Sequence, residues 1–207
     1  MAVVLGFGLW LRLSGTAGTV VDERWLHLVG LDVGSVPYWI AVTLAEVGGV
    51  NGAMICTGLA AALLVLLRRF RAAVVLVTTM LLGVALSEII KALVMRPRPH
   101  DQLYDSLGFS YPSGHAMGAT ALAMGLALIA TRAHMDRSAD PTRWRFHWPF
   151  ALAAVWILAM MWSRTALQVH WLTDTIAGVL LGLTVVVLAD AFWTVIAART
   201  RLPALRR

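Results

Sequence analysis

Six stretches of about 20 predominantly apolar residues run through the 207-residue chain. An α-helix rises 1.5 Å per residue, so about 20 residues cross the roughly 30 Å hydrocarbon core of a bilayer. Hydrophobic residues make up 59% of the chain and charged residues only 14%, which argues against a soluble domain with a solvated surface. We therefore predict an all-α fold, in which residues 1–207 form one integral membrane domain of six transmembrane helices.

The predicted spans cover residues 2–20, 38–67, 72–95, 112–130, 149–167 and 171–198. The first span competes with a cleaved signal peptide, but no positive charge precedes its apolar residues, which favours a retained helix. The second would be about 45 Å long as a straight helix, so we expect Gly48 and Gly49 to break or tilt it. Residues 22–31, after the first span, are predicted to form a short interfacial helix.

Basic residues are distributed unevenly between the two sides of the predicted bundle. Eleven of the 17 fall on one side and five on the other, with Arg12 inside the first span. Arginine and lysine near span ends are retained in the cytoplasm, so both termini are predicted to be cytoplasmic. The net charge of +6 therefore reflects membrane topology, and neither a nucleic acid nor an obligatory protein partner is expected. The five outer basic residues are Arg24, Lys91, Arg96, Arg98 and Arg164.

Two of these outer cations, Lys91 and Arg98, lie seven residues apart at the end of the third span. Pro97 and Pro99 prevent the helix from continuing, so we expect Arg98 to be held at the mouth of the bundle. The alternative is that both cations only reach toward lipid head groups, with Glu88 as a structural partner of Lys91.

A hydroxyl, a glycine and an imidazole open the fourth span, at Ser113, Gly114 and His115. The N-terminus of a helix presents unpaired N–H groups and the positive end of its dipole, which together favour an anion such as phosphate. Gly114 would let the backbone approach that anion closely. The alternative is a simple N-cap with a histidine at the membrane interface.

His170 and Asp174, at the start of the sixth span, are four residues apart and share one face of a helix. A carboxylate that accepts a hydrogen bond from one ring nitrogen leaves the other nitrogen available as a nucleophile. Arg164 adds a planar set of donors that suits phosphate oxygens. The alternative is an interfacial ion pair between His170 and Asp174.

The predicted topology places all three segments on the outer side of the membrane. Three cations, two histidines and a carboxylate are what phosphoryl transfer requires: charges for the phosphate oxygens, a nucleophile and an acid for the leaving oxygen. The three cations would repel a divalent ion, so neither a metal nor another cofactor is expected. The residue pattern alone leaves open whether His115 or His170 is the nucleophile.

These segments resemble the three-part signature of the type 2 phosphatidic acid phosphatases, in the same order and at matching spacing. The matching residues are Lys91-x6-Arg98-Pro99, Pro112-Ser113-Gly114-His115 and Ser163-Arg164-x5-His170-x3-Asp174. The resemblance implies a metal-independent membrane phosphatase that hydrolyses a lipid phosphate ester or anhydride at the extracytoplasmic face.

The resemblance also assigns a role to each residue. It implies that His170 attacks phosphorus to form a phosphohistidine, that Asp174 orients His170, and that His115 protonates the leaving group and then activates water. The implied phosphate ligands are Lys91, Arg98, Ser113, the Gly114 backbone N–H and Arg164.

The candidate substrates are lipids with a terminal phosphate: phosphatidic acid, phosphatidylglycerol phosphate and polyprenyl phosphates or diphosphates. The connection 100–110 faces the same side of the membrane as the site. A lipid phosphotransferase would use nearly the same residues, and vanadium haloperoxidases share the signature but are soluble. An anion transporter, with Glu46, Asn51, Glu88 and Asp190 along its path, is the non-enzymatic alternative.

Overall fold

The computed structural model describes residues 1–135 and 148–199, which form helices and connecting turns without a β-strand. The helices are α1 (Ala2–Ser14), α2 (Val20–Val29), α3 (Val36–Val47), α4 (Val50–Leu66), α5 (Phe70–Val94), α6 (Gly114–Met135), α7 (Trp148–Ala166) and α8 (Leu172–Arg199). The all-α prediction is therefore confirmed for this part of the chain. Six of the arginines assigned to the inner side lie outside the described residues: Arg137, Arg143, Arg145, Arg201, Arg206 and Arg207.

Four helices, α5 to α8, are long and apolar enough to cross a membrane, and α3 and α4 together make a fifth candidate span. The two helices of this pair are bent by 54°, and the break falls at Gly48 and Gly49 as predicted. The predicted first span is not confirmed. Its helix α1 has 13 residues, because Gly15 ends it in the left-handed conformation at a φ of 65°. Such a helix is about 20 Å long, which is shorter than the hydrocarbon core.

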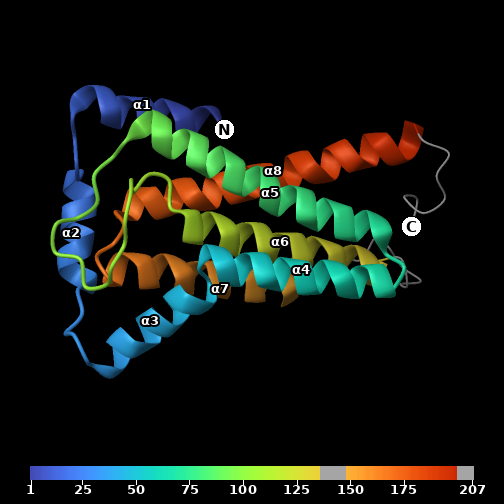
Figure 1. Ribbon diagram of the computed structural model, residues 1–207, viewed down its shortest axis with the longest axis horizontal. Coiled ribbons are helices and arrows are strands. Elements are labelled where there is room, and N and C mark those ends of the chain that lie inside the picture. Colours follow the sequence, from blue (N-terminus) through green and yellow to red (C-terminus); the bar gives the residue numbers. More distant parts are fainter. Residues whose placement is uncertain (136–147, 200–207) are drawn as a thin grey trace.

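Helix α2 forms where the sequence predicts a short helix, and it runs across the ends of the long helices (Figure 1). Its start is fixed by a capping box: the Thr19 hydroxyl accepts from the Asp22 N–H, and the Asp22 carboxylate accepts from the Thr19 N–H. Asp22 is fully buried even though α2 lies at the end of the bundle. This burial joins α2 to the site described below.

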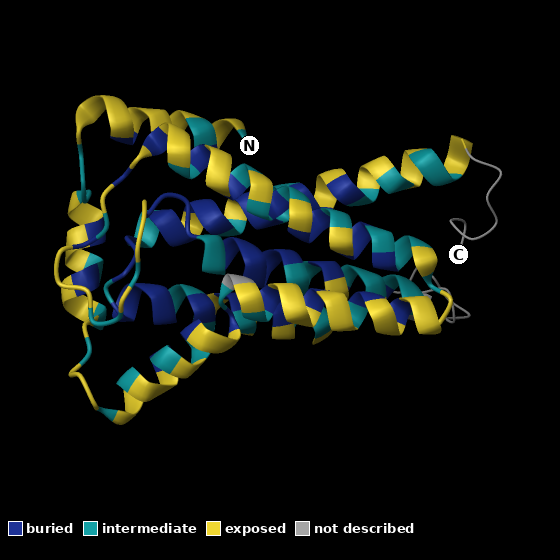
Figure 2. Cartoon of the chain, in the orientation of Figure 1, coloured by how far each residue is buried: buried dark blue, intermediate teal, exposed yellow. Residues whose placement is uncertain are grey.

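On the long helices, the buried residues lie on the sides that face the other helices of the bundle, and the exposed residues lie on the outer sides (Figure 2). The core between α5, α6 and α8 includes Met80, Met117, Leu181 and Val185. Many large apolar side chains point outward, among them Leu59, Val155, Leu158 and Val187. Exposed apolar surface of this extent is typical of helices that face lipid.

Helices α6 and α8 approach each other closely at two glycines. A Cβ atom on Gly178 would lie 2.4 Å from the Ser113 carbonyl oxygen, and one on Gly182 would lie 2.8 Å from the Met117 carbonyl oxygen. Only glycine fits there, because backbone atoms cannot move aside as a flexible side chain can. Small residues at such contacts let membrane helices pack backbone to backbone, and here they set the start of α6 against the start of α8.

We expect Gly178→Ala to destabilise the protein by roughly 1–3 kcal/mol and to lower its activity, because the new methyl group would push α6 away from α8. The matched control is Gly58→Ala, since a Cβ atom on Gly58 would meet nothing within 4 Å. Alanine favours a helix more than glycine does, so the stability of the Gly58→Ala variant should be unchanged or slightly higher than that of the native chain. Thermal unfolding in detergent checks both variants, and equal melting temperatures would contradict the close contact.

Candidate active site

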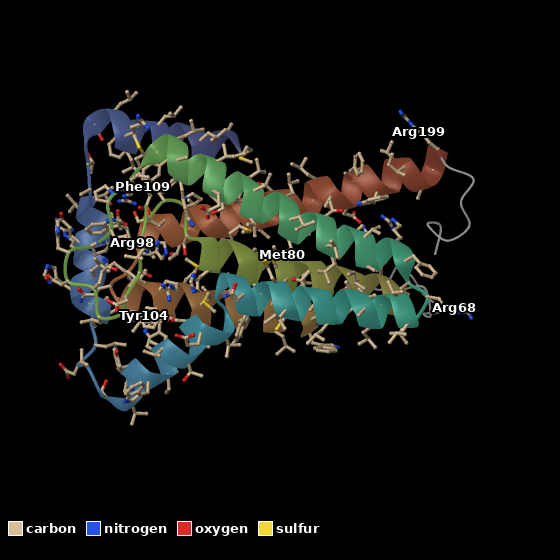
Figure 3. All side chains as sticks on the ribbon, in the orientation of Figure 1. Arg68, Met80, Arg98, Tyr104, Phe109 and Arg199 are labelled. Carbon is tan, nitrogen blue, oxygen red and sulfur yellow. The ribbon has the colours of Figure 1, made fainter. Side chains whose placement is uncertain are left out.

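The predicted site residues come together at one end of the bundle, from the end of α5, the start of α6, the end of α7 and the start of α8. They are Lys91, Arg98, Ser113, Gly114, His115, Arg164, His170 and Asp174. Arg98 marks this end of the molecule, and Arg68 and Arg199 mark the opposite one (Figure 3). The site is thus built at the ends of helices, where backbone groups are available for polar contacts.

His170 lies in the turn between α7 and α8 and is 2% exposed. Its backbone N–H donates to the Arg164 carbonyl at 3.3 Å, and its Nε2 lies 3.2 Å from Nη1 of Arg98. A guanidinium group only donates, so Nε2 presents its lone pair. Burial lowers the pKa of His170 well below its usual value, and the charges of Arg98, Arg164 and Lys91 lower it further. The ring is therefore uncharged at neutral pH, as a nucleophile requires.

The predicted pairing of His170 with Asp174 is only partly realised. Nδ1 of His170 lies 3.5 Å from Oδ2 of Asp174, which is longer than a good hydrogen bond, and Nδ1 has no hydrogen-bond partner in the described residues. The carboxylate has shorter contacts. Its Oδ2 accepts from the Trp171 N–H at 2.9 Å, and its Oδ1 accepts from Arg96 at 2.5 Å. Asp174 thus divides its charge between a histidine and an arginine.

Arg96 is a central residue of the site that the sequence analysis did not select. Its guanidinium group is almost fully buried and joins two carboxylates, Asp174 at 2.5 Å and Asp22 at 2.7 Å. It also donates to the Thr173 hydroxyl at 2.8 Å and to the Ala17 carbonyl at 2.7 Å. One arginine therefore fixes the start of α8 against α2 and the segment before it.

Asp22 completes this network from α2. It accepts from the Thr173 backbone N–H at 2.9 Å as well as from Arg96. Burial alone would raise the pKa of Asp22, but the Thr173 hydrogen bond and the positive charge of Arg96 lower it overall. The carboxylate is therefore ionised in the folded protein. In the sequence, the only signal at Asp22 is its place three residues after Thr19, which indicates a helix cap and not a site residue.

Arg98 lies beside His170, and most of its donors bind backbone carbonyls. Nε donates to Gly108 at 3.0 Å, Nη2 to Leu107 at 3.0 Å, and Nη1 to Val169 at 2.6 Å. These bonds fix the connection 100–110 over the end of the bundle and hold the guanidinium group next to the Nε2 atom of His170. Arg98 therefore both shapes the site and places a cation at the candidate nucleophile.

Arg164 is 1% exposed, and two of its donors, Nε and Nη1, are buried without a hydrogen-bond partner in the described residues. Its Nη2 donates to the Ser106 hydroxyl at 3.2 Å, and its guanidinium group lies 5.6 Å from the ring centre of Tyr104. The Tyr104 hydroxyl donates to Glu46. Buried cationic donors without partners are costly, so an oxyanion at this position would be strongly stabilised.

Lys91 forms an ion pair with Glu88 and also lies near the position where a phosphate would bind. Its Nζ pairs with Glu88 at 2.6 Å, as the alternative reading expects. The same Nζ lies 3.6 Å from where a Cβ atom on Gly114 would be, so the ammonium group also stands next to the first turn of α6. The Glu88 side chain is 63% exposed, and exposed ion pairs of this kind are weak. Lys91 can therefore turn toward an anion at the helix N-terminus.

Ser113 and His115 lie where the sequence predicts, at the start of α6. The Ser113 hydroxyl accepts from the Ala116 N–H at 3.4 Å as an N-cap, and the Ser113 N–H donates to the Asp174 carbonyl at 3.0 Å. Nε2 of His115 is 3.5 Å from where a Cβ atom on Gly49 would be. The break between α3 and α4 thus makes space for this imidazole.

This arrangement suits an oxyanion. The buried Arg164, the half-buried Arg98, a lysine and a helix N-terminus supply positive charge around an uncharged imidazole. Within residues 1–135 and 148–199, no three His, Cys, Asp or Glu side chains gather closely enough to bind a metal ion. The donors point instead to binding a phosphate group by side chains and backbone N–H groups.

Two comparisons with known proteins, one of sequence and one of structure, agree with this geometry. The sequence model of the PAP2 superfamily matches residues 72–200. The fold is similar to the crystal structure of a transmembrane PAP2-type phosphatidylglycerolphosphate phosphatase from Bacillus subtilis, with a TM-score of 0.77, 20% identity, and coverage of 97% of this chain and 98% of that chain. It is also similar to Aquifex aeolicus LpxE, with a TM-score of 0.65, 17% identity, and coverage of 84% and 97%. No curated protein sequence matches the chain.

Proposed function

The chain belongs to the PAP2 superfamily and is a membrane phosphatase of this type; from that premise we propose that it hydrolyses a lipid phosphate or diphosphate without a metal ion, through a phosphohistidine on His170. One observation carries the proposal. An uncharged, buried His170 lies 3.2 Å from Arg98, close to an Arg164 whose buried donors Nε and Nη1 have no partner in the described residues.

In the first step, Nε2 of His170 attacks phosphorus. The N–P bond forms while the bond from phosphorus to the leaving oxygen breaks, and His115 gives a proton to that oxygen. Arg98, Arg164 and Lys91 stabilise the charge on the phosphate oxygens, together with the Ser113 hydroxyl and the Gly114 N–H. Asp174, 3.5 Å from Nδ1, stabilises the positive charge that develops on the imidazole.

In the second step, water releases the phosphate. His115, left without its proton by the first step, takes a proton from the water as its oxygen attacks phosphorus. The N–P bond breaks, inorganic phosphate leaves and His170 returns to its neutral form. Arg96 takes no part in bond making. We assign it the task of holding Asp174 in place, because it donates to the Asp174 carboxylate at 2.5 Å.

We place the site on the extracytoplasmic side of a six-span bundle, with α2 at the interface and both termini in the cytoplasm, on the strength of the arginine asymmetry. A site at the helix ends lies near the level of lipid head groups, so a membrane lipid is the expected substrate. Phosphatidylglycerol phosphate is the first to test, since the similar Bacillus subtilis protein is a phosphatidylglycerolphosphate phosphatase. Phosphatidic acid and polyprenyl phosphates or diphosphates complete the panel.

The test is phosphate release from these lipids by the purified full-length chain in detergent with excess chelator. We expect release from at least one of them at an undiminished rate in the chelator. Loss of activity in chelator would contradict the metal-free mechanism. Disappearance of the lipid phosphate without free phosphate, and with a newly phosphorylated lipid, would instead identify a phosphotransferase.

A further inference from the structure

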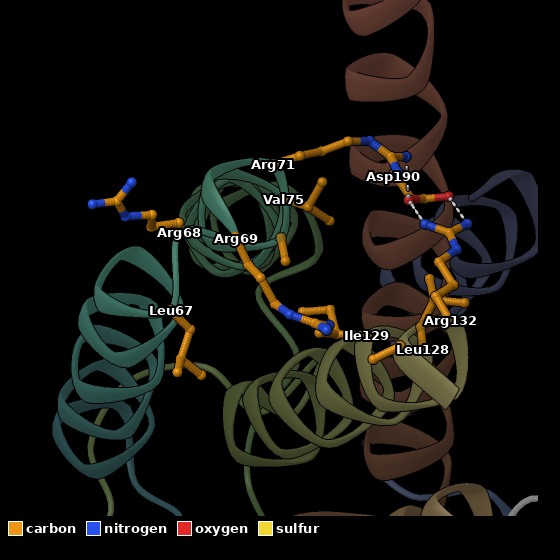
Figure 4. A pocket seen from close by; sticks show the side chains of 11 residues that line it. Leu67, Arg68, Arg69, Arg71, Val75, Leu128, Ile129, Arg132 and Asp190 are labelled. Carbon is orange, nitrogen blue, oxygen red and sulfur yellow. Dashed lines mark hydrogen bonds and ion pairs between the residues drawn. The ribbon is translucent and has the colours of Figure 1, made fainter. Parts of the chain in front are cut away.

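A second charged site lies at the opposite end of the bundle from the candidate active site. A cavity of about 960 Å³ opens there between the α4–α5 turn, α6 and α8. Figure 4 shows the residues that line it, among them Arg69, Arg71, Arg132 and Asp190. None of them belongs to the PAP2 motif segments, so this cavity needs its own explanation.

Among the described residues that line this cavity, positive charge exceeds negative charge. Asp190 is the one carboxylate among them, and it binds both Arg71, at 3.1 Å, and Arg132, at 2.7 Å. Arg68 and Arg69 also line the cavity. The guanidinium groups of these two make no hydrogen bond or ion pair within the described part of the chain. Four arginines and one carboxylate are thus among the described lining residues.

Arg69 is the most informative of these arginines. Its guanidinium group points between α5 and α6 toward Ile129, whereas that of Arg68 points away from the Asp190 cluster (Figure 4). Arg71, next to it in the cavity, keeps its Nε buried without a hydrogen-bond partner in the described residues. Two arginines of one helix terminus thus present donors that the rest of the described chain does not use, and an anion would satisfy them.

The remaining walls of the cavity are apolar. Leu67, Val75, Leu128 and Ile129 line it beside the arginines, and Leu67 is 60% exposed on the outer surface. A small inorganic anion would use the guanidinium groups but not these walls. A ligand with an anionic head and hydrocarbon chains would use both, and a cavity of this volume is in the range of sites that hold such molecules.

We propose that this cavity binds an anionic phospholipid of the adjacent leaflet as a structural ligand. Its phosphodiester would lie against Arg69 and Arg71, and its acyl chains would continue along Leu67 and Ile129 to the surface of the bundle. The bound lipid would join α5 to α6 and, through the Arg71–Asp190 pair, to α8. The site is separate from catalysis, because it lies at the end of the molecule marked by Arg68, opposite Arg98 (Figure 3).

The test is thermal unfolding of the full-length protein in a neutral detergent, with added dioleoyl phosphatidylglycerol or dioleoyl phosphatidylcholine. We expect phosphatidylglycerol to raise the melting temperature by several degrees and phosphatidylcholine to have little effect. In Arg69→Gln, the phosphatidylglycerol concentration needed for the same rise should increase at least about tenfold. Without lipid, this variant should melt like the native chain, because the Arg69 guanidinium group has no hydrogen-bond or ion-pair partner among residues 1–135 and 148–199.

The matched control is Arg199→Gln, an exposed arginine at the same end of the bundle (Figure 3), which should respond to phosphatidylglycerol like the native chain. Three outcomes would overturn the proposal: an unchanged response in Arg69→Gln, an equal rise with phosphatidylcholine, or an equal rise with glycerol phosphate. The first would place the lipid elsewhere, including the candidate active site. The second would indicate a purely apolar effect, and the third a site for a free anion.

Discussion

Replacing His170 by alanine is expected to lower phosphate release by about three orders of magnitude or more, because the variant lacks the atom that forms the bond to phosphorus. The measurement is the initial rate of release from the best lipid of the panel. His27→Ala is the matched control, since His27 is exposed on α2 at the same end of the molecule. A melting temperature close to that of the native chain would show that the His170 variant is folded.

The two histidines can be told apart with p-nitrophenyl phosphate, whose leaving group needs no proton. If His170 is the nucleophile, His115→Ala should still form the phosphoenzyme from this compound but hydrolyse it slowly, because no base activates the water. Acid-labile label should therefore accumulate in His115→Ala and be absent from His170→Ala. The reverse pattern would make His115 the nucleophile, which the sequence pattern left open.

The second large effect is expected at Arg96, which makes no proposed contact with the substrate. Arg96→Ala would leave the buried carboxylates of Asp22 and Asp174 without their shared cation. Removing one partner from a buried ion pair costs about 3–5 kcal/mol, so we expect the free energy of unfolding to fall by that amount. Denaturant unfolding of the detergent-solubilised chain measures it. Arg24→Ala, an exposed arginine of α2, should change stability by less than about 0.5 kcal/mol.

Arg96→Lys separates positioning from simple charge. A lysine keeps the charge but cannot bridge Asp22, Asp174 and Thr173 at once, so we expect it to fold and to show a lower kcat with little change in KM. An unchanged kcat would show that Asp174 needs no such support.

The pKa of Asp22 is lowered in the folded state. The contribution of Asp22 to the free energy of unfolding is therefore present above its ordinary pKa of 3.8 and is lost as the pH falls further.

Much of the helical layout could be predicted because apolar run length and proline or glycine breaks are local properties of the sequence. The ends of α5 and α6, and the break at Gly48 and Gly49, lie within a few residues of the predicted positions. The predicted length of the first span is not confirmed, because Gly15 adopts a left-handed conformation and ends α1 at Ser14. An apolar stretch rich in Gly, Ser and Thr does not reveal which glycine will do so.

Within the candidate site, too, the residues that short-range spacing connects could be predicted, and those that long-range contacts connect could not. The three segments could be selected from the sequence because each pairs reactive residues at short range, as in His170 with Asp174 four residues later. Arg96 was not identified as a site residue from the sequence, because its partner Asp174 is 78 residues away and its partner Asp22 is 74 residues away. No periodicity or spacing connects such positions, so only the packing of α2 and of the segment after α5 against the start of α8 brings them into contact.

The sequence by itself determined the membrane character of the chain, its helical class and the residue types of a phosphoryl-transfer site, since these follow from apolar length and from short-range spacing. The tertiary structure decided how the polar groups are paired. Asp174 is held mainly by Arg96 and Trp171, with His170 at 3.5 Å, because Arg96 is buried between Asp22 and Asp174 and binds both carboxylates. The cavity around Arg69 likewise exists only because the α4–α5 turn, α6 and α8 meet in space.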